Sequence, residues 1–541
     1  MLGGEWPEGG ASWLARVGWG GWLPLVLRGP ADRSALFEAV TCTTGVMKLC
    51  ERPAWEASAL EGARAADGLA EPAVLYKELT GPVAVSPSRY PVLAALGGRA
   101  SADMAAALAK AHTERRLRIR LPALVVLSTR GLTGMLPGYE RYEDDDGPLM
   151  RALARSGTPF AALDWEAVAR LELEDAGALD WSDVVTVAVR TAWSYSESLS
   201  KCRAFVALLC TLEKDRGVKV VNAAAVTRRT VHKSYLQRFA ARYGVRTVPS
   251  LLMRAPSRRP GAAECPAGAA WGDGSLDVVD EAARRGWDAA LVKPCVGGGS
   301  RLTRVFATTD EGAARVAAAG CRCLTPSEAR AFVRRCLDGT PGRFTAGALF
   351  VEEPAAGGED MLLQPFVPSV QSLGELSVIV VRGDGGRPRV SHAVRKVPKR
   401  GEYRVQGEFG AREVAVEPTA GEAEAATAAF LALAADASPG ADAGRSDGLG
   451  FDGLAATSLG LPLEASSCFG PGPSGPPVAA CRVDMLSPDA ADADRRPMVI
   501  EVEAIEPSLF AQIVPEGLSS ADAETMTRRR ADAIAAAILS S

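Results

Sequence analysis

Two strand-like segments near the C-terminus limit how this chain can fold more than any other feature of its sequence. They read ACRVDML and PMVIEVEAI, and each carries charged residues at alternate positions. Alternate side chains of a β-strand share one face, so Glu501 and Glu503 point the same way, as do Arg482 and Asp484. Such a cluster is costly to bury without counter-charge. Two divalent cations such as magnesium would offset that cost, and a solvated polar face is the alternative interpretation.

A lysine that ends a hydrophobic strand is the second chemical feature. Lys293 closes the run AALVKP and is followed closely by three glycines and a serine. Glycine lets backbone N–H groups approach a phosphate, and lysine supplies a positive charge. A glycine run alone is weak evidence in a chain with 55 glycines, and this one matches neither a Walker loop nor G-x-G-x-x-G. A lysine at the end of a buried strand just before such a run is stronger evidence for a phosphate site, although it leaves the ordinary interpretation open.

Other segments have an ordinary and a functional interpretation. Lys233 stands at the start of a predicted helix, where solvent exposure is the simpler explanation because its charge opposes the helix dipole. The segment containing Gln364, Phe366 and Val367 ends a predicted strand, and its backbone could pair with an adenine edge. Glu375 could accept hydrogen bonds from ribose hydroxyls. Taken alone, the plain strand end is favoured.

Length and patterning predict several domains, because 541 residues are too many for one hydrophobic core. Strands that alternate with helices in the middle of the chain predict a parallel α/β domain. The predicted divisions are an N-terminal extension of unknown role (1–115), the α/β domain (116–230), and two α+β units (231–360 with a Pro/Gly-rich insert at 255–275, and 361–541 with a low-complexity insert at 438–478).

Composition argues against several classes of protein. The formal net charge is -4, with 61 Lys+Arg against 65 Asp+Glu, which gives no sign of a polyanion-binding surface. No apolar run approaches the roughly 20 residues that a transmembrane helix needs. The 11 scattered cysteines favour reduced thiols in the cytoplasm, and three histidines are too few for a histidine-built zinc site. We therefore expect a cytoplasmic protein with neither a nucleic-acid nor a membrane partner. Organellar import by the N-terminal extension and homo-oligomerisation are left open.

The order of the motifs along the chain is more informative than any single motif. VRTAWSY, KSYL, LVKP with GGGS, QPFVPS, SHAVRK, YRVQ, CRVD and EVEAIEPSLF follow one another between about residues 120 and 515. This order resembles the ATP-grasp superfamily, in the RimK-like branch that contains bacterial glutathione synthetases and the cycloserine-forming ligase. The resemblance implies an ATP-grasp fold of mixed α/β and α+β class. In that fold a pre-ATP-grasp parallel α/β domain precedes two α+β lobes that enclose ATP.

The resemblance also implies a role for each motif residue. Lysines and the glycine loop would hold the ATP phosphates, the strand end would form the adenine hinge, and a glutamate would meet the ribose. Carboxylates would bind two magnesium ions, with Mn²⁺ as an alternative. The implied ATP-binding residues are Lys233, Lys293, Gly297, Gly298, Gly299, Ser300, Gln364, Phe366, Val367 and Glu375; the implied metal ligands are Asp484, Glu501 and Glu503; the implied catalytic residues are Arg482, facing the transferred phosphate, and Arg404 and Lys396, facing the acyl substrate.

The implied activity is the ATP-dependent joining of a small-molecule carboxylate to an amine through an acyl phosphate. One departure concerns the phrase R-S-T-W-D-Y of this branch, where the chain has Ala192 and Ser194. That difference puts the acceptor substrate in doubt. The alternatives are the same fold with a non-amine or hydroxylamine-like acceptor, and a nucleotide-binding regulatory protein with a decayed ligase domain.

Overall fold

The chain forms two compact units, and the candidate site residues all belong to the second. The first unit comprises residues 1–192 with 215–220, and the second comprises 193–214 with 221–541. Nearly all of the predicted inserts at 255–275 and 438–478, and most of the predicted extension, lie outside the described residues. The computed structural model describes residues 12–17, 21–26, 80–84, 119–129, 140–174, 178–255, 277–340, 344–345, 351–352, 358–438, 477–487 and 496–540.

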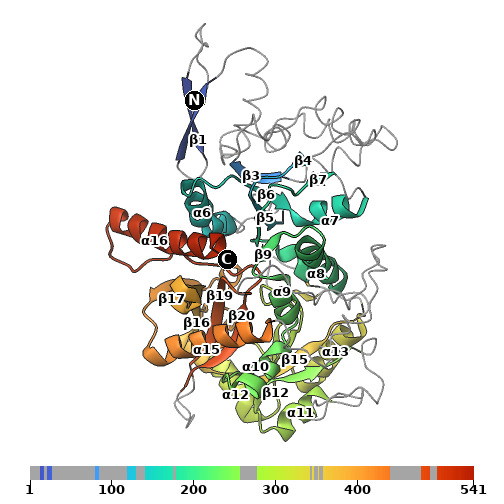
Figure 1. Ribbon diagram of the computed structural model, residues 1–541. Helices are drawn as coiled ribbons and strands as arrows, with labels where there is room; N and C mark the ends of the chain where they lie inside the picture. Colours follow the sequence, from blue (N-terminus) through green and yellow to red (C-terminus); the bar gives the residue numbers. More distant parts are fainter. Residues whose placement is uncertain are drawn as a thin grey trace, which may run out of the picture. The chain divides into compact units, whose positions relative to one another are not determined.

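A five-stranded sheet, ordered β3-β6-β5-β8-β9, organises the first unit (Figure 1). The central strand β5 pairs in parallel with β6 and β8, whereas the edge strand β3 is antiparallel to β6. The strands β5, β6 and β8 are almost wholly buried, as is typical of parallel strands covered on both faces. This confirms the predicted parallel α/β architecture. The elements are β3 (Thr80–Ala84), β5 (Leu124–Ser128), α6 (Glu140–Arg155), β6 (Phe160–Asp164), α7 (Trp165–Glu174), β8 (Thr186–Val189) and β9 (Lys219–Val221), with short pairs formed by β1 (Ser12–Val17) and β2 (Gly21–Val26), and by β4 (Ile119–Arg120) and β7 (Leu179–Asp180).

The second unit contains two antiparallel sheets, and the first has the order β10-β15-β11-β12. Hydrophobic side chains of its strands pack against α11 and α13, with Phe332 and Met361 in the same cluster. This lobe carries the glycine run directly after β11. Its elements are β10 (Leu251–Met253), α11 (Val278–Arg284), β11 (Ala289–Pro294), β12 (Arg304–Ala307), α12 (Asp310–Ala318), α13 (Pro326–Asp338) and β15 (Met361–Pro365), with the short pair β13 (Phe344–Thr345) and β14 (Val351–Glu352).

The other sheet has five strands, all antiparallel, in the order β18-β17-β16-β19-β20. The alanine-rich helix α15 contacts four of these strands, and the C-terminal helix α16 contacts three of them. Together the two sheets confirm the predicted α+β lobes. The elements are α14 (Ser369–Leu373), β16 (Glu375–Arg382), β17 (Pro388–Val397), β18 (Arg412–Val416), α15 (Ala420–Asp436), β19 (Ala480–Leu486), β20 (Met498–Glu503) and α16 (Ser520–Leu539), preceded in the same unit by α8 (Leu199–Lys214), α9 (Ala224–Thr230) and α10 (Tyr235–Tyr243).

Most predicted elements are present, with local differences. The helix predicted to end at Gly244 does so, and that glycine has the left-handed conformation (φ +65°) of a helix C-cap. The strand predicted over 245–253 forms only at Leu251–Met253, because Val248 and Pro249 precede it in irregular backbone. Lys233 was expected at the start of α10, but it lies in the turn between α9 and α10.

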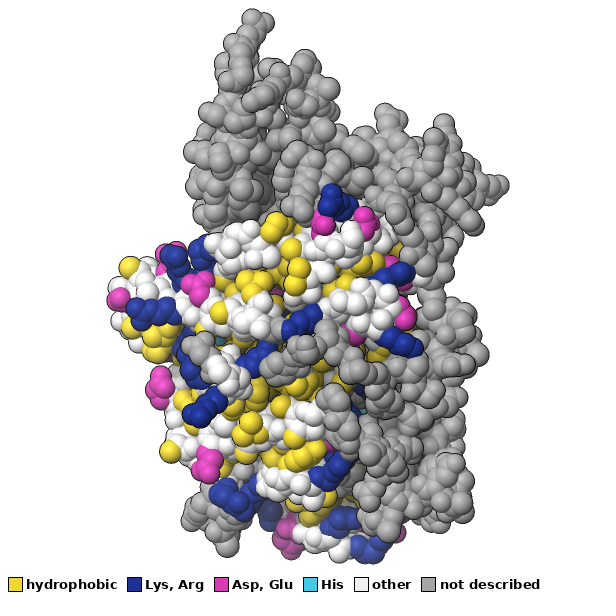
Figure 2. Space-filling model, viewed as in Figure 1, with side chains coloured by type: hydrophobic (Ala, Val, Ile, Leu, Met, Phe, Trp, Pro, Cys, Tyr) yellow, Lys and Arg dark blue, Asp and Glu magenta, His cyan; other side chains and the backbone are white. Residues whose placement is uncertain are grey.

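The described surface is mixed in character. On the face shown in Figure 2, Lys and Arg side chains lie among Asp, Glu and hydrophobic side chains. Within the described part of the chain, no helix has the length and apolar character needed to cross a membrane.

Two first-turn glycines provide a matched test of the packing. A Cβ at Gly312 of α12 would lie 1.8 Å from the Asp288 carbonyl oxygen, whereas a Cβ at Gly421 of α15 would meet nothing within 4 Å. We expect Gly312→Ala to lower the free energy of unfolding by about 1–3 kcal/mol, because relieving the overlap must move backbone. Gly421→Ala should raise it, by at most about 1 kcal/mol, since alanine favours helix. Urea unfolding of both variants measures this, and equal effects would contradict the packing described.

Candidate functional site

The candidate site occupies the face of the five-stranded sheet that is opposite to α15. Val378, Val483 and Val502 pack on the α15 side in one hydrophobic cluster. Because side chains alternate along a strand, the neighbours of these valines point to the other face. All the predicted site residues of β16, β17, β19 and β20 have this second orientation, so the sheet gathers them on a single face.

Strand register then arranges the charged residues in rows. In one row Ser377 of β16 pairs with Asp484 of β19, and Asp484 pairs with Glu501 of β20. In the next row Arg482 pairs with Glu503. The shared face predicted from sequence alternation is therefore present, and the register adds which group stands opposite which.

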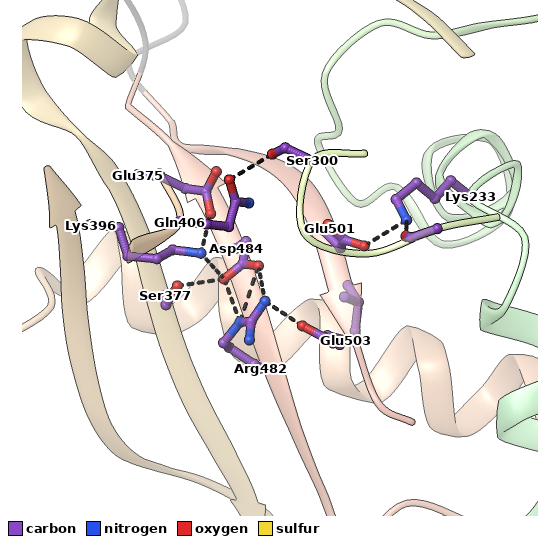
Figure 3. A network of polar contacts seen from close by, with 12 residues as sticks. Lys233, Ser300, Glu375, Ser377, Lys396, Gln406, Arg482, Asp484, Glu501 and Glu503 are labelled. Atoms are coloured by element: carbon purple, nitrogen blue, oxygen red, sulfur yellow. Dashed lines mark hydrogen bonds and ion pairs between the residues drawn. The ribbon is translucent and has the colours of Figure 1, made fainter. Parts of the chain in front are cut away.

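Asp484 is the most heavily engaged carboxylate of these rows (Figure 3). Ser377 Oγ donates to its Oδ1 at 2.6 Å, and Arg482 donates from Nε to Oδ1 and from Nη2 to Oδ2, both at 2.9 Å. Arg482 Nη2 also forms an ion pair with Glu503. Burial alone would raise the pKa of Asp484, but Arg482 and Lys396 outweigh it and hold that pKa well below its usual range. Asp484 is therefore an anion fixed between two cations.

Lys396 of β17 extends this charge chain to a second carboxylate. Its Nζ lies 2.5 Å from Glu375 Oε1 and 3.6 Å from Asp484 Oδ1. Burial would lower the pKa of Lys396, yet Asp484 and Glu375 outweigh that effect and raise it. Glu375 behaves differently, because burial raises its pKa despite the neighbouring lysine. The predicted ribose residue and a predicted acyl-substrate residue are thus ion-paired to each other.

Two lysines from outside the five-stranded sheet reach the same place: Lys233 in the turn between α9 and α10, and Lys293 in β11. Lys233 Nζ lies 3.0 Å from Glu501 Oε1 and donates to the carbonyl oxygen of Gly297 at 2.6 Å. Lys293 is buried at the end of β11, and burial lowers its pKa while Glu501 opposes that shift. Figure 3 shows Lys233 and Glu501 pointing toward each other from different segments. Through these two contacts Lys233 links the glycine loop to β20, the outer strand of the five-stranded sheet.

The two outer glutamates have opposite electrostatic environments. Burial alone would raise the pKa of Glu501, but Lys233 and Lys293 outweigh it and lower that pKa. For Glu503 burial prevails, and the pKa is raised although Arg482 opposes the shift. Two carboxylates that stand two positions apart on one strand therefore have pKa values shifted in opposite directions. Lys233 and Lys293 lower that of Glu501, whereas burial raises that of Glu503.

The glycine loop after β11 has an unusual backbone. Gly297 and Gly299 have φ values of +154° and +57°, and Ser300 and Leu302 also have positive φ, at +55° and +52°. Left-handed conformations cost a non-glycine residue roughly 1–2 kcal/mol. Full burial of Leu302 and a 2.7 Å hydrogen bond from Ser300 Oγ to Gln406 Oε1 help to hold the turn. The loop is therefore fixed from both of its sides.

Some predicted residues make contacts of another kind. Gln364 Nε2 donates to Ser250 Oγ at 2.8 Å, and the Phe366 N–H donates to the Ala289 carbonyl at 3.0 Å. The Phe366 ring packs edge-on against Tyr403, with ring centres 6.3 Å apart. The two hydrogen bonds belong to the packing of the β10-β15-β11-β12 lobe, and the ring contact joins that lobe to the segment between β17 and β18. The adenine hinge stays a prediction.

Arg404 is held by its own segment. Its Nε and Nη2 donate to the two carboxylate oxygens of Glu402 at 2.9 and 2.6 Å, and its guanidinium carbon lies 3.7 Å from the centre of the Phe409 ring. The structure therefore places Arg404 in a different set of contacts from the carboxylates of the sheet. Its role toward an acyl substrate stays a prediction.

Sequence reasoning overlooked two polar residues of the site, Ser377 and Gln406. Ser377 follows Glu375 by two positions, so strand alternation alone puts both on one face. Gln406 ends the phrase YRVQ, but no feature of the sequence indicates that it meets the glycine loop. A serine beside a row of charges could thus have been found, whereas the glutamine could not.

The predicted metal ligands can be tested for their fit to magnesium. In the part of the chain that is described, no three Asp, Glu, His or Cys side chains converge closely enough to hold an ion. Glu501 and Glu503 instead face Lys233 and Arg482, with 31% and 27% of their side chains exposed. Their oxygen donors suit magnesium chemically. An ion would have to share these carboxylates with their basic partners, and the metal site stays a prediction.

Comparison with known proteins finds similar solved structures. No protein-family model matches the chain, and no curated protein matches it. The D-cycloserine synthetase DcsG is 21% identical, with 77% of this chain and 99% of that chain covered and a TM-score of 0.46. A D-alanine–D-alanine ligase from Bacillus anthracis is 13% identical, covering 78% and 97%, with a TM-score of 0.41. The RimK domain protein ATP-grasp from Sphaerobacter thermophilus DSM 20745 is 13% identical, covering 77% and 100%, with a TM-score of 0.39. The names of the first and third, a cycloserine synthetase and a RimK ATP-grasp protein, are names found in the branch that the motif order resembles.

Removing one lysine tests how far the buried charges depend on one another. We expect Lys396→Met to lower the free energy of unfolding by about 3 kcal/mol or more, because Glu375 and Asp484 lose a buried counter-charge. The double variant Lys396→Met/Glu375→Gln should recover part of this loss. As a control, Arg412→Met removes a 3.9 Å pair with Glu516 whose side chains are 72% and 85% exposed. That control should change the free energy of unfolding by no more than about 0.5 kcal/mol. Similar losses in the single variant and the control would contradict the proposed dependence.

Proposed function

We propose that this chain is an ATP-grasp ligase that joins a small-molecule carboxylate to an amine, with ATP and two magnesium ions. The observation that carries the proposal is the meeting of two lysines with an Arg–Asp–Glu cluster. The 3.0 Å contact between Lys233 Nζ and Glu501 Oε1 marks that meeting point. Positive groups suited to phosphates thus face carboxylates suited to magnesium.

The nucleotide phosphates would occupy the space that Lys233, Lys293 and the glycine loop surround. Both lysines already lie near an anionic group, Glu501, so phosphate oxygens would replace or share that partner. The positive φ values of Gly297 and Gly299 support close approach of backbone N–H groups to an anion. Adenine would lie beside Gln364, Phe366 and Val367, and its ribose beside Glu375, as the motif order implies.

Phosphoryl transfer would depend on the fixed direction of Arg482. Asp484 and Glu503 hold its guanidinium from two sides, so little reorganisation is needed when negative charge develops on the transferred group. Bound magnesium, held by Asp484, Glu501 and Glu503, would supply further neutralisation of that charge. The terminal phosphoryl group of ATP moves to an oxygen of the substrate carboxylate, which yields ADP and an acyl phosphate.

The second step would form the product bond. The amine nitrogen attacks the acyl carbon, and inorganic phosphate leaves with the electron pair of the broken C–O bond. Arg482 would stabilise the oxyanion of the tetrahedral intermediate, and Arg404 and Lys396 would orient the acyl substrate. Glu402 and Phe409 keep the Arg404 guanidinium in one orientation, which favours this use. We place the reaction in the cytoplasm, with no nucleic-acid or membrane partner.

Nucleotide binding is the first requirement of this proposal. We expect calorimetry with a non-hydrolysable ATP analogue to show magnesium-dependent binding to the full chain. Lys293→Met should weaken that binding by at least about tenfold, a loss of about 1.4 kcal/mol, because a buried charge beside the phosphates is lost. Lys214→Met, at an exposed position at the end of α8, is the matched control. Absence of binding by the parent at millimolar nucleotide would exclude the proposed family of reactions.

Turnover separates a working ligase from a nucleotide-binding protein with a decayed site. ADP release should appear with one combination in a panel of carboxylates and amines, and hydroxylamine in the panel tests the alternative acceptor. Glu501→Gln should then reduce turnover by about two orders of magnitude or more, the scale of losing one preorganised electrostatic contact. Glu516→Gln, which alters an 85% exposed glutamate, should have no effect. Nucleotide binding without ADP release for any combination would favour the decayed alternative.

A further inference from the structure

Two of the motifs contain residues that the proposed chemistry leaves unexplained, and the structure brings them together. They are His392 in SHAVRK and the Leu509–Phe510 pair that ends EVEAIEPSLF. His392 Nε2 lies 2.7 Å from the Leu509 carbonyl oxygen, although 117 residues separate them. Both residues are buried, at 5% and 1% exposure. The proposed chemistry does not account for this contact between His392 and Leu509.

His392 belongs to the same face of the sheet as the charged rows. It pairs with Ile379 of β16, and Ile379 pairs in turn with Arg482 of β19. The row therefore runs from the histidine through one hydrophobic residue to the arginine. Ala393, which follows His392 in the sequence, packs in the hydrophobic cluster on the opposite face of the sheet, the face that α15 covers.

The hydrogen bonds of His392 fix its chemical form. Burial lowers the pKa of His392 to about 4, with the nearby Arg530 contributing, so the ring is neutral near pH 7. A carbonyl oxygen can only accept, so Nε2 must carry the proton. Nδ1 is then an acceptor, and Ser391 Oγ lies 3.0 Å from it. His392 thus acts as a fixed donor to the Leu509 carbonyl.

That carbonyl belongs to the segment that brings an aromatic ring to Arg482. Phe510 has φ +50°, a conformation that a bulky side chain rarely adopts unless its surroundings impose it. Its ring centre lies 5.7 Å from the Arg482 guanidinium carbon, within the range of a cation–π contact. On the other side, Arg530 Nη1 of α16 donates to the Ile513 carbonyl at 2.5 Å. The segment is therefore held at two points, with Phe510 between them.

We propose that His392 is a positioning residue for Arg482, which acts by holding Phe510 over the guanidinium. The Phe510 ring lies beside the Arg482 guanidinium, whose residue is 9% exposed, and it restricts the access of water to that guanidinium. Loss of the His392 hydrogen bond releases Phe510 from its strained conformation and exposes Arg482. The kinetic consequence rests on the proposed function, whereas the structural consequence does not.

Chemical modification of Arg482 tests the structural consequence directly. The rate at which phenylglyoxal modifies Arg482 in the ligand-free full chain is measured by mass spectrometry of its peptide. His392→Leu keeps an apolar side chain but cannot donate, so Arg482 should be modified several-fold faster. His392→Gln can donate through its amide and should restore the parental rate. Ser391→Ala, which removes only the Nδ1 contact, is the matched control and should behave like the parent.

Kinetics with the carboxylate and amine that the parent accepts give the second readout. His392→Leu should lower kcat by about tenfold or more while leaving the KM for ATP within about twofold, because misplacing a charge-stabilising group affects the transition state most. His392→Gln should again resemble the parent. An unchanged Arg482 modification rate in His392→Leu, or failure of His392→Gln to restore it, would overturn the proposal.

The role of His392 stays testable even if His392→Leu does not fold or the parent binds no nucleotide. If His392→Leu does not fold, Phe510→Leu removes the ring and keeps the histidine contact, and it must show the same faster modification of Arg482. An unchanged rate in that variant would also overturn the proposal. A parent that binds no nucleotide would refute the proposed function, yet the modification rates would still decide the role of His392.

Discussion

The ion pair between Arg482 and Asp484 is the interaction on which the rest of the candidate site depends. Asp484 is 2% exposed, and its oxygens accept from Arg482 and from Ser377. Lys396 Nζ lies 3.6 Å from the same carboxylate and reaches it from β17, on the far side of β16. Buried ion pairs are often no better for stability than apolar packing of the same volume. Stabilisation of the fold therefore does not explain why these charges are buried, whereas binding of a ligand would.

The sheet makes this arrangement rigid because it supplies every member of the cluster from backbone that is already hydrogen-bonded. Three neighbouring strands carry Ser377, Asp484 and Glu501 in one row, so their spacing is set by strand geometry and not by flexible loops. The glycine loop is different, since it is held by side-chain contacts: Lys233 links it to β20, and Ser300 links it to Gln406 in the segment after β17. The charges of the site are thus fixed by the sheet, and the loop that faces them is held by individual hydrogen bonds and ion pairs.

The sequence predicted the local features of this site better than its long-range ones. Alternation along the last strands was enough to place Glu501 and Glu503 on one face, and the hydrophobic run before Lys293 was enough to predict β11. Which residues stand opposite one another was not predictable, because β16 and β19 are about a hundred residues apart and register shifts occur in β16–β17 and β19–β20. The contact between His392 and Leu509 depends on the same pairings. The role of Arg404 came from the motif order alone. Alternation of charged residues indicated a metal site at Asp484, Glu501 and Glu503, but the same pattern also fits a solvated polar face.

In the proposed function, these charges stabilise transfer of a phosphoryl group to a carboxylate. An isotope experiment tests it most directly: a panel of carboxylates labelled with heavy oxygen is incubated with an amine, ATP and magnesium, and the released phosphate is analysed by mass spectrometry. An acyl phosphate passes one carboxylate oxygen to the phosphate when the amine attacks. We expect ADP and phosphate carrying one heavy oxygen to appear together for the accepted carboxylate. ADP formed with unlabelled phosphate only, or no ADP with any carboxylate, would contradict it.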